Sequence, residues 1–272
     1  MSPSALQPYA EVIGDPIAQS KSPTIHTFWL ACLGIDARYS ACHVTAEGLA
    51  DYLTDRRGDS AWRGCNVTMP HKQAVMPFLD RIDPLAARIG AVNTIVRDAD
   101  GLLSGFNTDA PGFLEPLADR ECRVVTVIGA GGAARAVLVA LADRGVEWVS
   151  LQNRNVEKAQ ALLAEFGLPG GAFALGSAVK TADLLVNTSS LGMTGQPALP
   201  PLLDHVAPHA TIYDIVTSPL ETALLRDARG QGLAVIDGLS MLIGQADYAF
   251  AHFFGQRPPR DRDDELRARI TA

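Results

Sequence analysis

Hydrophobic positions in the first hundred residues fall into short apolar runs separated by longer segments of mixed character. Runs of four to eight apolar residues predict strands, and longer amphipathic segments predict helices. The predicted strands are 9–13, 36–44 and 64–67, followed by a hairpin of 91–96 and 102–106 around Asp98-Ala99-Asp100-Gly101. The predicted helices are 22–33, 49–56 and 74–82, the first with Ser22 as N-cap and Pro23 at its first position. This alternation indicates an α/β layer.

The pattern changes after Arg123. Val124–Ile128 is a continuous apolar run, as a fully buried parallel strand requires. The strands predicted after it are 146–152, 184–187, 211–216 and 232–236, and the helices are 133–144, 156–166, 219–229 and 239–256. A β-α-β series of this kind predicts a doubly wound, Rossmann-type nucleotide-binding fold. The charged segment 257–264 is expected to be a solvated tail.

Composition narrows the class of protein. The chain has 272 residues, 47% of them apolar, which is enough for two domains of ordinary size. A net charge of −7 argues against nucleic acid as a partner. Residues 1–9 lack the features of a signal peptide, and no apolar run is long enough to span a membrane. We therefore expect a cytoplasmic protein with reduced cysteines and, since neither Cys nor His shows ligand spacing, no metal.

A glycine-rich turn follows the strand at 124–128. Gly129-Ala130-Gly131-Gly132-Ala133-Ala134 joins this strand to a predicted helix, so backbone N–H groups and the helix N-terminus can approach a pyrophosphate. The alternative is a plain packing turn. The next strand ends in Leu151-Gln152-Asn153-Arg154, without the acidic residue typical of an NAD site. Arg154 and Lys158 instead favour the 2′-phosphate of NADP, unless they are only a solvated surface pair.

Two polar clusters in the first hundred residues are candidates for a substrate site. Ser20 and Ser22 lie two residues apart at a predicted helix start, where both hydroxyls can donate to one carboxylate. Helix capping is the alternative for Ser22 but does not explain Ser20. Lys72 follows Asn66-Val67-Thr68-Met69-Pro70-His71 and is the candidate catalyst, with Asp109 as its partner. Asn66 and Asn93 can bind substrate hydroxyls.

These motifs together resemble the shikimate dehydrogenase family. The resemblance covers about residues 9–256, with the segments in the family's order. The matching stretches are Gly14–His26, Asn66–Lys72, Gly90–Thr94, Asn107–Asp109, Gly129–Ala134, Asn153-Arg154, Asn187–Ser189, Tyr213-Asp214 and Asp237–Gln245.

The resemblance implies an enzyme that reversibly reduces 3-dehydroshikimate to shikimate with NADPH, in the biosynthesis of chorismate and aromatic amino acids. It implies a substrate domain of residues 1–108 completed by 239–272, and an NADP domain of 109–238. Lys72 and Asp109 would be the catalytic pair. The implied substrate ligands are Ser20 and Ser22 at the carboxylate and Asn66, Thr68, Asn93 and Gln245 at the ring hydroxyls. The implied cofactor ligands are Gly129–Ala133, Asn153, Arg154 and Lys158, with Ile215 and Gly238 near the nicotinamide.

Two positions depart from the family's pattern. Thr217 stands where the family commonly has tyrosine, so it keeps a hydroxyl at the substrate but loses reach. Asn155 stands where the family commonly has threonine, next to the expected 2′-phosphate site. Both leave room for a quinate/shikimate dehydrogenase, and a non-catalytic NADP-binding regulator is a further alternative. The expected partner is a small-molecule substrate, and the expected assembly is a monomer or homodimer.

Overall fold

The computed structural model describes residues 6–271 and divides into two compact units. The first unit contains the chain up to Thr108 and again from Gln245, and the second contains Asp109–Gly244. Residues 239–244, expected from the sequence in the first domain, fall in the second unit in this division. They belong to the second unit, where a Cβ on Gly244 would lie 3.1 Å from Gly112 Cα, so this turn of the C-terminal helix packs closely on that unit.

The first unit is built on a mixed six-stranded sheet in the order β2-β1-β3-β5-β6-β4. Its strands are β1 (Tyr9–Gly14), β2 (Arg38–His43), β3 (Trp62–Val67), β4 (Arg81–Ile82), β5 (Thr94–Arg97) and β6 (Leu103–Phe106). The first three strands are parallel, and β5 and β6 form the predicted antiparallel hairpin. The helices of this unit are α1 (Ser22–Leu33), α2 (Leu49–Gly58), α3 (Pro84–Ile89), the end of α8 (Gly238–Phe254) and α9 (Asp263–Thr271).

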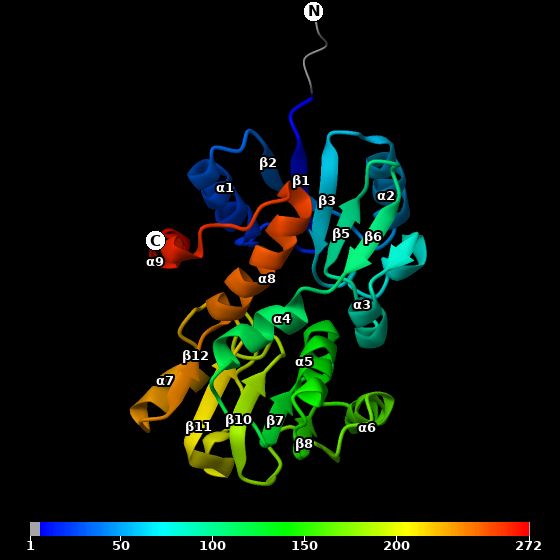
Figure 1. Ribbon diagram of the computed structural model, residues 1–272. Coiled ribbons are helices and arrows are strands. Elements are labelled where there is room, and N and C mark those ends of the chain that lie inside the picture. The colour runs from blue at the N-terminus through cyan, green and yellow to red at the C-terminus, as the bar shows by residue number, and fades with distance from the viewer. Residues whose placement is uncertain (1–5, 272) are drawn as a thin grey trace, which may run out of the picture. The chain divides into compact units, whose positions relative to one another are not determined.

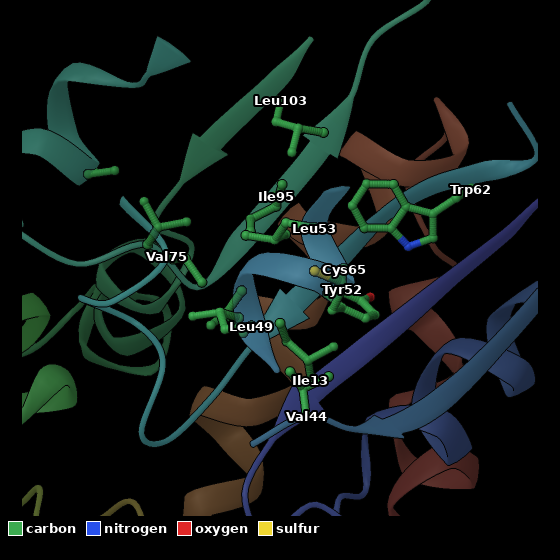
Figure 2. Close-up of a cluster of buried hydrophobic side chains, with 13 residues drawn as sticks. Ile13, Val44, Leu49, Tyr52, Leu53, Trp62, Cys65, Val75, Ile95 and Leu103 are labelled. Atoms are coloured by element: carbon green, nitrogen blue, oxygen red, sulfur yellow. The ribbon is translucent and has the colours of Figure 1, made fainter. Parts of the chain in front are cut away.

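A buried cluster fills one face of this sheet, where alternate side chains of β1 and β3 meet α2 (Figure 2). Ile13 and Cys65 come from these strands, and Leu53 and Tyr52 come from the helix. The other face of the sheet carries Ala10 and Asn66, because successive side chains of a strand point to opposite faces. Asn66, which is discussed below, therefore lies on the face away from this core.

The second unit is a fully parallel sheet in the order β12-β11-β10-β7-β8-β9 (Figure 1). Its strands are β7 (Val124–Ile128), β8 (Trp148–Gln152), β9 (Gly170–Phe173), β10 (Ala182–Asn187), β11 (Val206–Asp214) and β12 (Ala234–Ile236). Its helices are α4 (Asp109–Leu114), α5 (Gly132–Asp143), α6 (Val156–Glu165), α7 (Ala223–Gly230) and the start of α8. Counted within the unit, the strand order is 3-2-1-4-5-6, that of a dinucleotide-binding sheet. The predicted fold class is confirmed.

Several local predictions are wrong. Residues 74–82 form turns, a 3₁₀ helix (Met76–Phe78) and β4 instead of an α-helix, because Pro77 interrupts helical hydrogen bonding. The helix α3 was missed although Asp83 caps it and Gly90 ends it in the left-handed conformation. The charged tail is partly the helix α9, and α7 begins only after Thr222, which caps it.

Candidate functional site

Buried polar side chains of the first unit form a connected network at the ends of β3 and β5. Asn93 Nδ2 donates to Thr108 Oγ1 at 3.0 Å, and Asn93 Oδ1 accepts from the Thr108 amide at 2.8 Å. Thr108 Oγ1 in turn donates to Gln245 Oε1 at 3.4 Å, at the point where α8 enters this unit. All three side chains are less than 10% exposed. The predicted substrate ligands Asn93 and Gln245 are therefore brought together, and Thr108 is the residue that joins them.

Asn66 extends this network to the other side of β3. Its Nδ2 donates to Thr94 Oγ1 at 3.1 Å and to the Asn93 carbonyl at 3.4 Å. Its Oδ1 accepts from the hydroxyl of Tyr39 at 2.6 Å. Tyr39 was not predicted as a site residue, because a tyrosine within a strand carries no motif that separates it from a core residue.

The serine loop before α1 differs in detail from its prediction. Lys21, not Ser22, is at the N-cap position, and Ser22 is the first residue of the helix. Ser20 Oγ accepts from the Ser22 amide at 3.3 Å, so Ser20 satisfies a backbone donor at the helix start. A hydroxyl that accepts in this way keeps its proton for another acceptor. Lys21 Nζ donates to the carbonyl of Ile270, which ties this loop to α9.

Lys72 lies in the turns that follow β3. Its carbonyl accepts from the amide of Val92 at 2.7 Å, and its side chain is half-buried. Thr68 lies four residues before Lys72, and its amide donates to the carbonyl oxygen of Ile13 at 2.9 Å. A Cβ on Gly14 would lie 2.5 Å from Thr68 Cγ2, so the absence of a side chain at Gly14 lets the two loops meet. The first unit thus contains Lys72 and Thr68 together with the asparagine network.

Asp109 and Thr217 belong to the second unit. Asp109 is the first residue of α4 and is 5% exposed. Thr217 lies in the loop after β11 and is half-buried. The amide of Ile215, in the same loop, donates to Asn187 at 3.1 Å, and a Cβ on Gly238 would lie 2.5 Å from the carbonyl oxygen of Ile215. Ile215 and Gly238 are therefore neighbours, as their common predicted role requires.

The glycine-rich turn has the geometry that a pyrophosphate needs. Gly129 has a φ of +105°, and a Cβ there would lie 2.9 Å from Thr188 Oγ1. Gly131 is exposed, and a Cβ there would meet nothing within 4 Å. Gly131 is also the N-cap of α5 and offers no side chain to its first N–H groups. An open backbone at the N-terminus of a 12-residue helix suits an anion, so these residues fit a dinucleotide.

The end of β8 leads into the segment that contains Arg154 and Lys158, the predicted 2′-phosphate ligands. Gln152, the last residue of β8, is buried: its Nε2 donates to the carbonyl of Ser177 at 3.2 Å, and its Oε1 accepts from the amide of Gly176 at 2.7 Å. Asn155 caps α6 by accepting from the Lys158 amide at 2.8 Å. Arg154 therefore precedes the helix, and Lys158 lies in its first turn. Both cations are nevertheless exposed on either side of the cap.

A second polar network, for which no role was predicted from the sequence, lies at the carboxyl ends of β10 and β11. Asp214 is fully buried and accepts from Asn187 Nδ2 at 2.9 Å, the Val216 amide at 3.1 Å and Thr222 Oγ1 at 2.7 Å. Burial raises the pKa of Asp214, while these three donors favour its charged form. The carboxylate fixes the loop that contains Ile215 and Thr217. An Asn or Asp as the last residue of a buried parallel strand was the available signal.

Comparison with known proteins identifies the family. Residues 12–95 match the model of the shikimate dehydrogenase substrate binding domain, and residues 115–190 match that of shikimate / quinate 5-dehydrogenase. The NADP(+) shikimate dehydrogenase of Sphingopyxis alaskensis is 56% identical, with 100% of both chains covered. The chain belongs to the shikimate dehydrogenase family. The serine loop, Asn66 and Asn93 thus lie within the segment that matches this family's substrate binding domain.

Solved structures of family members have the same fold. Shikimate 5-dehydrogenase from Thermus thermophilus, in complex with NADP(H) and shikimate, is 40% identical with a TM-score of 0.87, covering 97% of this chain and 100% of that one. Quinate dehydrogenase from Corynebacterium glutamicum, in complex with NAD, is 30% identical with a TM-score of 0.86, covering 97% and 99%.

Neither a metal centre nor a membrane span is found in residues 6–271. No three His, Cys, Asp or Glu side chains of this part of the chain are grouped so that they could hold a metal ion. None of its helices combines the length and apolar character needed to cross a bilayer. All four cysteines are unpaired, with Cys65 and Cys122 buried.

Proposed function

We propose that this protein catalyses the reversible, NADPH-dependent reduction of 3-dehydroshikimate to shikimate, a step in chorismate and aromatic amino acid biosynthesis. The observation that carries the proposal is the identity of 56% over the whole chain with an NADP-dependent shikimate dehydrogenase. The Thermus relative that binds NADP(H) and shikimate has the same fold, which supports a small-molecule substrate and this cofactor. The first unit would bind the substrate and the second the cofactor.

The substrate would be held by polar groups that its carboxylate and hydroxyls can pair with. Ser20 and Ser22 would donate to the carboxylate next to the start of α1. Asn66, Asn93 and Gln245 are buried and hydrogen-bonded, so their orientation is set before the substrate binds. Preorganised groups of this kind lose little entropy on binding. Thr68 would complete the set of ring-hydroxyl ligands.

Lys72 would supply the proton that the reduced carbonyl oxygen requires. As an ammonium it can also stabilise negative charge that develops on that oxygen, and both effects lower the barrier. Asp109, at the start of α4, would orient Lys72 and the reacting hydroxyl. In the direction of oxidation the same lysine would receive the proton.

Residues of the second unit would bind the dinucleotide. Gly129, Ala130, Gly131, Gly132 and Ala133 would surround the pyrophosphate at the N-terminus of α5. When bound, NADPH supplies the hydride for the reaction. Arg154 and Lys158 would pair with the 2′-phosphate, and Asn153, whose Nδ2 donates to the Asn155 carbonyl at 2.9 Å, would contact the ribose side. Ile215 and Gly238 would lie against the nicotinamide.

Thr217 supports a second candidate, a quinate/shikimate dehydrogenase. The substrate hydroxyl ligand at this position is shorter than the tyrosine common in the family, and a quinate dehydrogenase that binds NAD is 30% identical to this chain. The lack of an acid after Gln152 favours NADP over NAD. A cytoplasmic location and a monomeric or homodimeric state remain predictions.

Initial rates with shikimate and quinate, each with NADP⁺ and NAD⁺, test the proposal. Selective turnover of shikimate with NADP⁺ is expected. Comparable kcat/KM for quinate would move the protein to the second candidate. Binding of NADPH without turnover of either acid would indicate a non-catalytic regulator and refute the proposal.

A further inference from the structure

Tyr39 is a buried tyrosine that reaches across a strand toward the predicted substrate ligands. It lies on β2, at the edge of the first unit's sheet, and pairs with Ala10 on β1. Ala10 in turn pairs with Gly64 on β3, two residues before Asn66 and on the same face. Both intervening positions are small, so the tyrosine side chain has room to pass over β1. A Cβ on Gly64 would lie 2.8 Å from the ring of Phe253, so a larger residue at position 64 would not fit beside that ring.

The hydroxyl of Tyr39 contacts two predicted substrate ligands. It donates to Asn66 Oδ1 at 2.6 Å, and it interacts with the side chain of Ser22. Burial raises the pKa of Tyr39, so the group stays a protonated donor at every pH at which the protein is assayed. The ring itself is fixed by His26, which stacks on it at 4.0 Å with an interplanar angle of 3°. Tyr39 therefore has a defined position and a defined hydrogen-bond direction.

The tyrosine determines how the amide of Asn66 is oriented. Because Oδ1 accepts from Tyr39, Nδ2 must point to the other side, where it donates to Thr94 Oγ1 at 3.1 Å and the Asn93 carbonyl at 3.4 Å. Both hydrogens of Nδ2 are thereby directed at protein acceptors. An amide oxygen has two lone pairs, so Oδ1 can accept one more hydrogen bond.

We propose that Tyr39 is a positioning residue for substrate binding, which fixes Asn66 as an acceptor for a ring hydroxyl of the substrate. This inference rests on the proposed function, because it takes Asn66 to be a substrate ligand. Without the tyrosine hydroxyl, the Asn66 amide can rotate and present donor hydrogens to a substrate hydroxyl that should itself donate. Tyr39 would thus act through Asn66 and not by contact with the substrate.

The test compares Tyr39→Phe with Tyr52→Phe in shikimate oxidation. Tyr52 is a matched control, since it lies in the buried cluster on the other face of the same sheet (Figure 2). Its hydroxyl donates to Glu11 Oε2 at 2.8 Å. We expect Tyr39→Phe to raise the KM for shikimate about three- to tenfold, as the loss of one oriented hydrogen bond does, with a smaller change in kcat. The KM for NADP⁺ should stay at the wild-type value, and Tyr52→Phe should leave both KM values unchanged.

A double-mutant cycle shows whether Tyr39 acts through Asn66. In an Asn66→Ala background, Tyr39→Phe should change the KM for shikimate less than about 1.5-fold, because coupled residues are non-additive. Equal effects in both backgrounds overturn the proposal, as does an unchanged KM in the single variant. An inactive wild-type protein would instead refute the proposed function, so the two failures are distinct.

Nuclear magnetic resonance of the intact protein gives a second readout should Tyr39→Phe fail to fold. A fixed Asn66 amide, with both Nδ2 hydrogens donated to protein acceptors, predicts side-chain NH₂ protons that exchange slowly with solvent and signals that shift on addition of shikimate. Rapid solvent exchange of these protons in the protein without substrate would overturn the proposal.

Discussion

His26 makes the stability of this protein sensitive to mild acid. The imidazole is fully buried on α1 and stacks between Tyr39 and Phe250. Neither ring nitrogen has a hydrogen-bond partner among the described residues. Burial lowers the pKa of His26 to about 3 from its ordinary value of 6.5, since a charged ring has no compensating group nearby.

The sign and size of the effect follow from proton linkage. Below its ordinary pKa, His26 is protonated in the unfolded chain and neutral in the folded one, so acid favours unfolding. The stability that depends on neutral His26 is complete above pH 6.5 and is lost progressively as the pH falls toward 3. One pKa unit corresponds to about 1.4 kcal/mol, so the loss at pH 5 is about 2 kcal/mol.

Urea unfolding at pH 7.5 and pH 5.0 measures this loss in the wild type and in His26→Phe. Phenylalanine keeps the ring stack but cannot take a proton, so its unfolding free energy should fall about 2 kcal/mol less between the two pH values. His209→Gln is the control, because that side chain is 77% exposed, and it should show the wild-type pH dependence. An equal fall in wild type and His26→Phe would refute the reasoning.

Two further predictions concern the second unit. Gly129→Ala should raise the KM for NADP⁺ on the order of tenfold, because the new Cβ would clash with Thr188. Gly145 has a φ of +70° but open space around it, so Gly145→Ala should leave this KM unchanged. Equal KM values for the two variants in steady-state kinetics would contradict the role of the turn. Asp214→Asn should lower the unfolding free energy by about 1–3 kcal/mol, since an NH₂ group replaces the carboxylate oxygen that accepts from Thr222 Oγ1. Urea unfolding should show a loss of less than about 0.5 kcal/mol for the exposed Asp227→Asn.

The second unit was the more predictable part of the fold. The apolar run Val124–Ile128, the glycines after it and the alternation of strands and helices together specify a parallel nucleotide-binding sheet, and the strand order agrees. Helix ends were less predictable where a proline competed with helical spacing, as at Pro77. The missed helix α3 had an Asp-Pro start and a Gly end, so local capping signals were present but were outweighed by the apolar pattern before them.

The candidate site could be predicted as a set of motifs but not as a network. The sequence predicts Asn66, Asn93 and Gln245 as separate ligands, whereas their connection through Thr108 and Thr94 depends on where β5 and α8 meet. Tyr39 could not be predicted, because its reach to Asn66 requires the small side chains that happen to face it on two neighbouring strands.

The kinetic effect of Lys72→Ala shows whether Lys72 transfers the proton in this reaction. Lys180→Ala is the matched control, since Lys180 is an exposed lysine of the second unit that packs on Trp148. With shikimate and NADP⁺, the account predicts that Lys72→Ala loses on the order of 10²–10⁴ in kcat with a smaller change in KM, while Lys180→Ala keeps wild-type values. A folded Lys72→Ala variant with near-normal kcat would contradict the account.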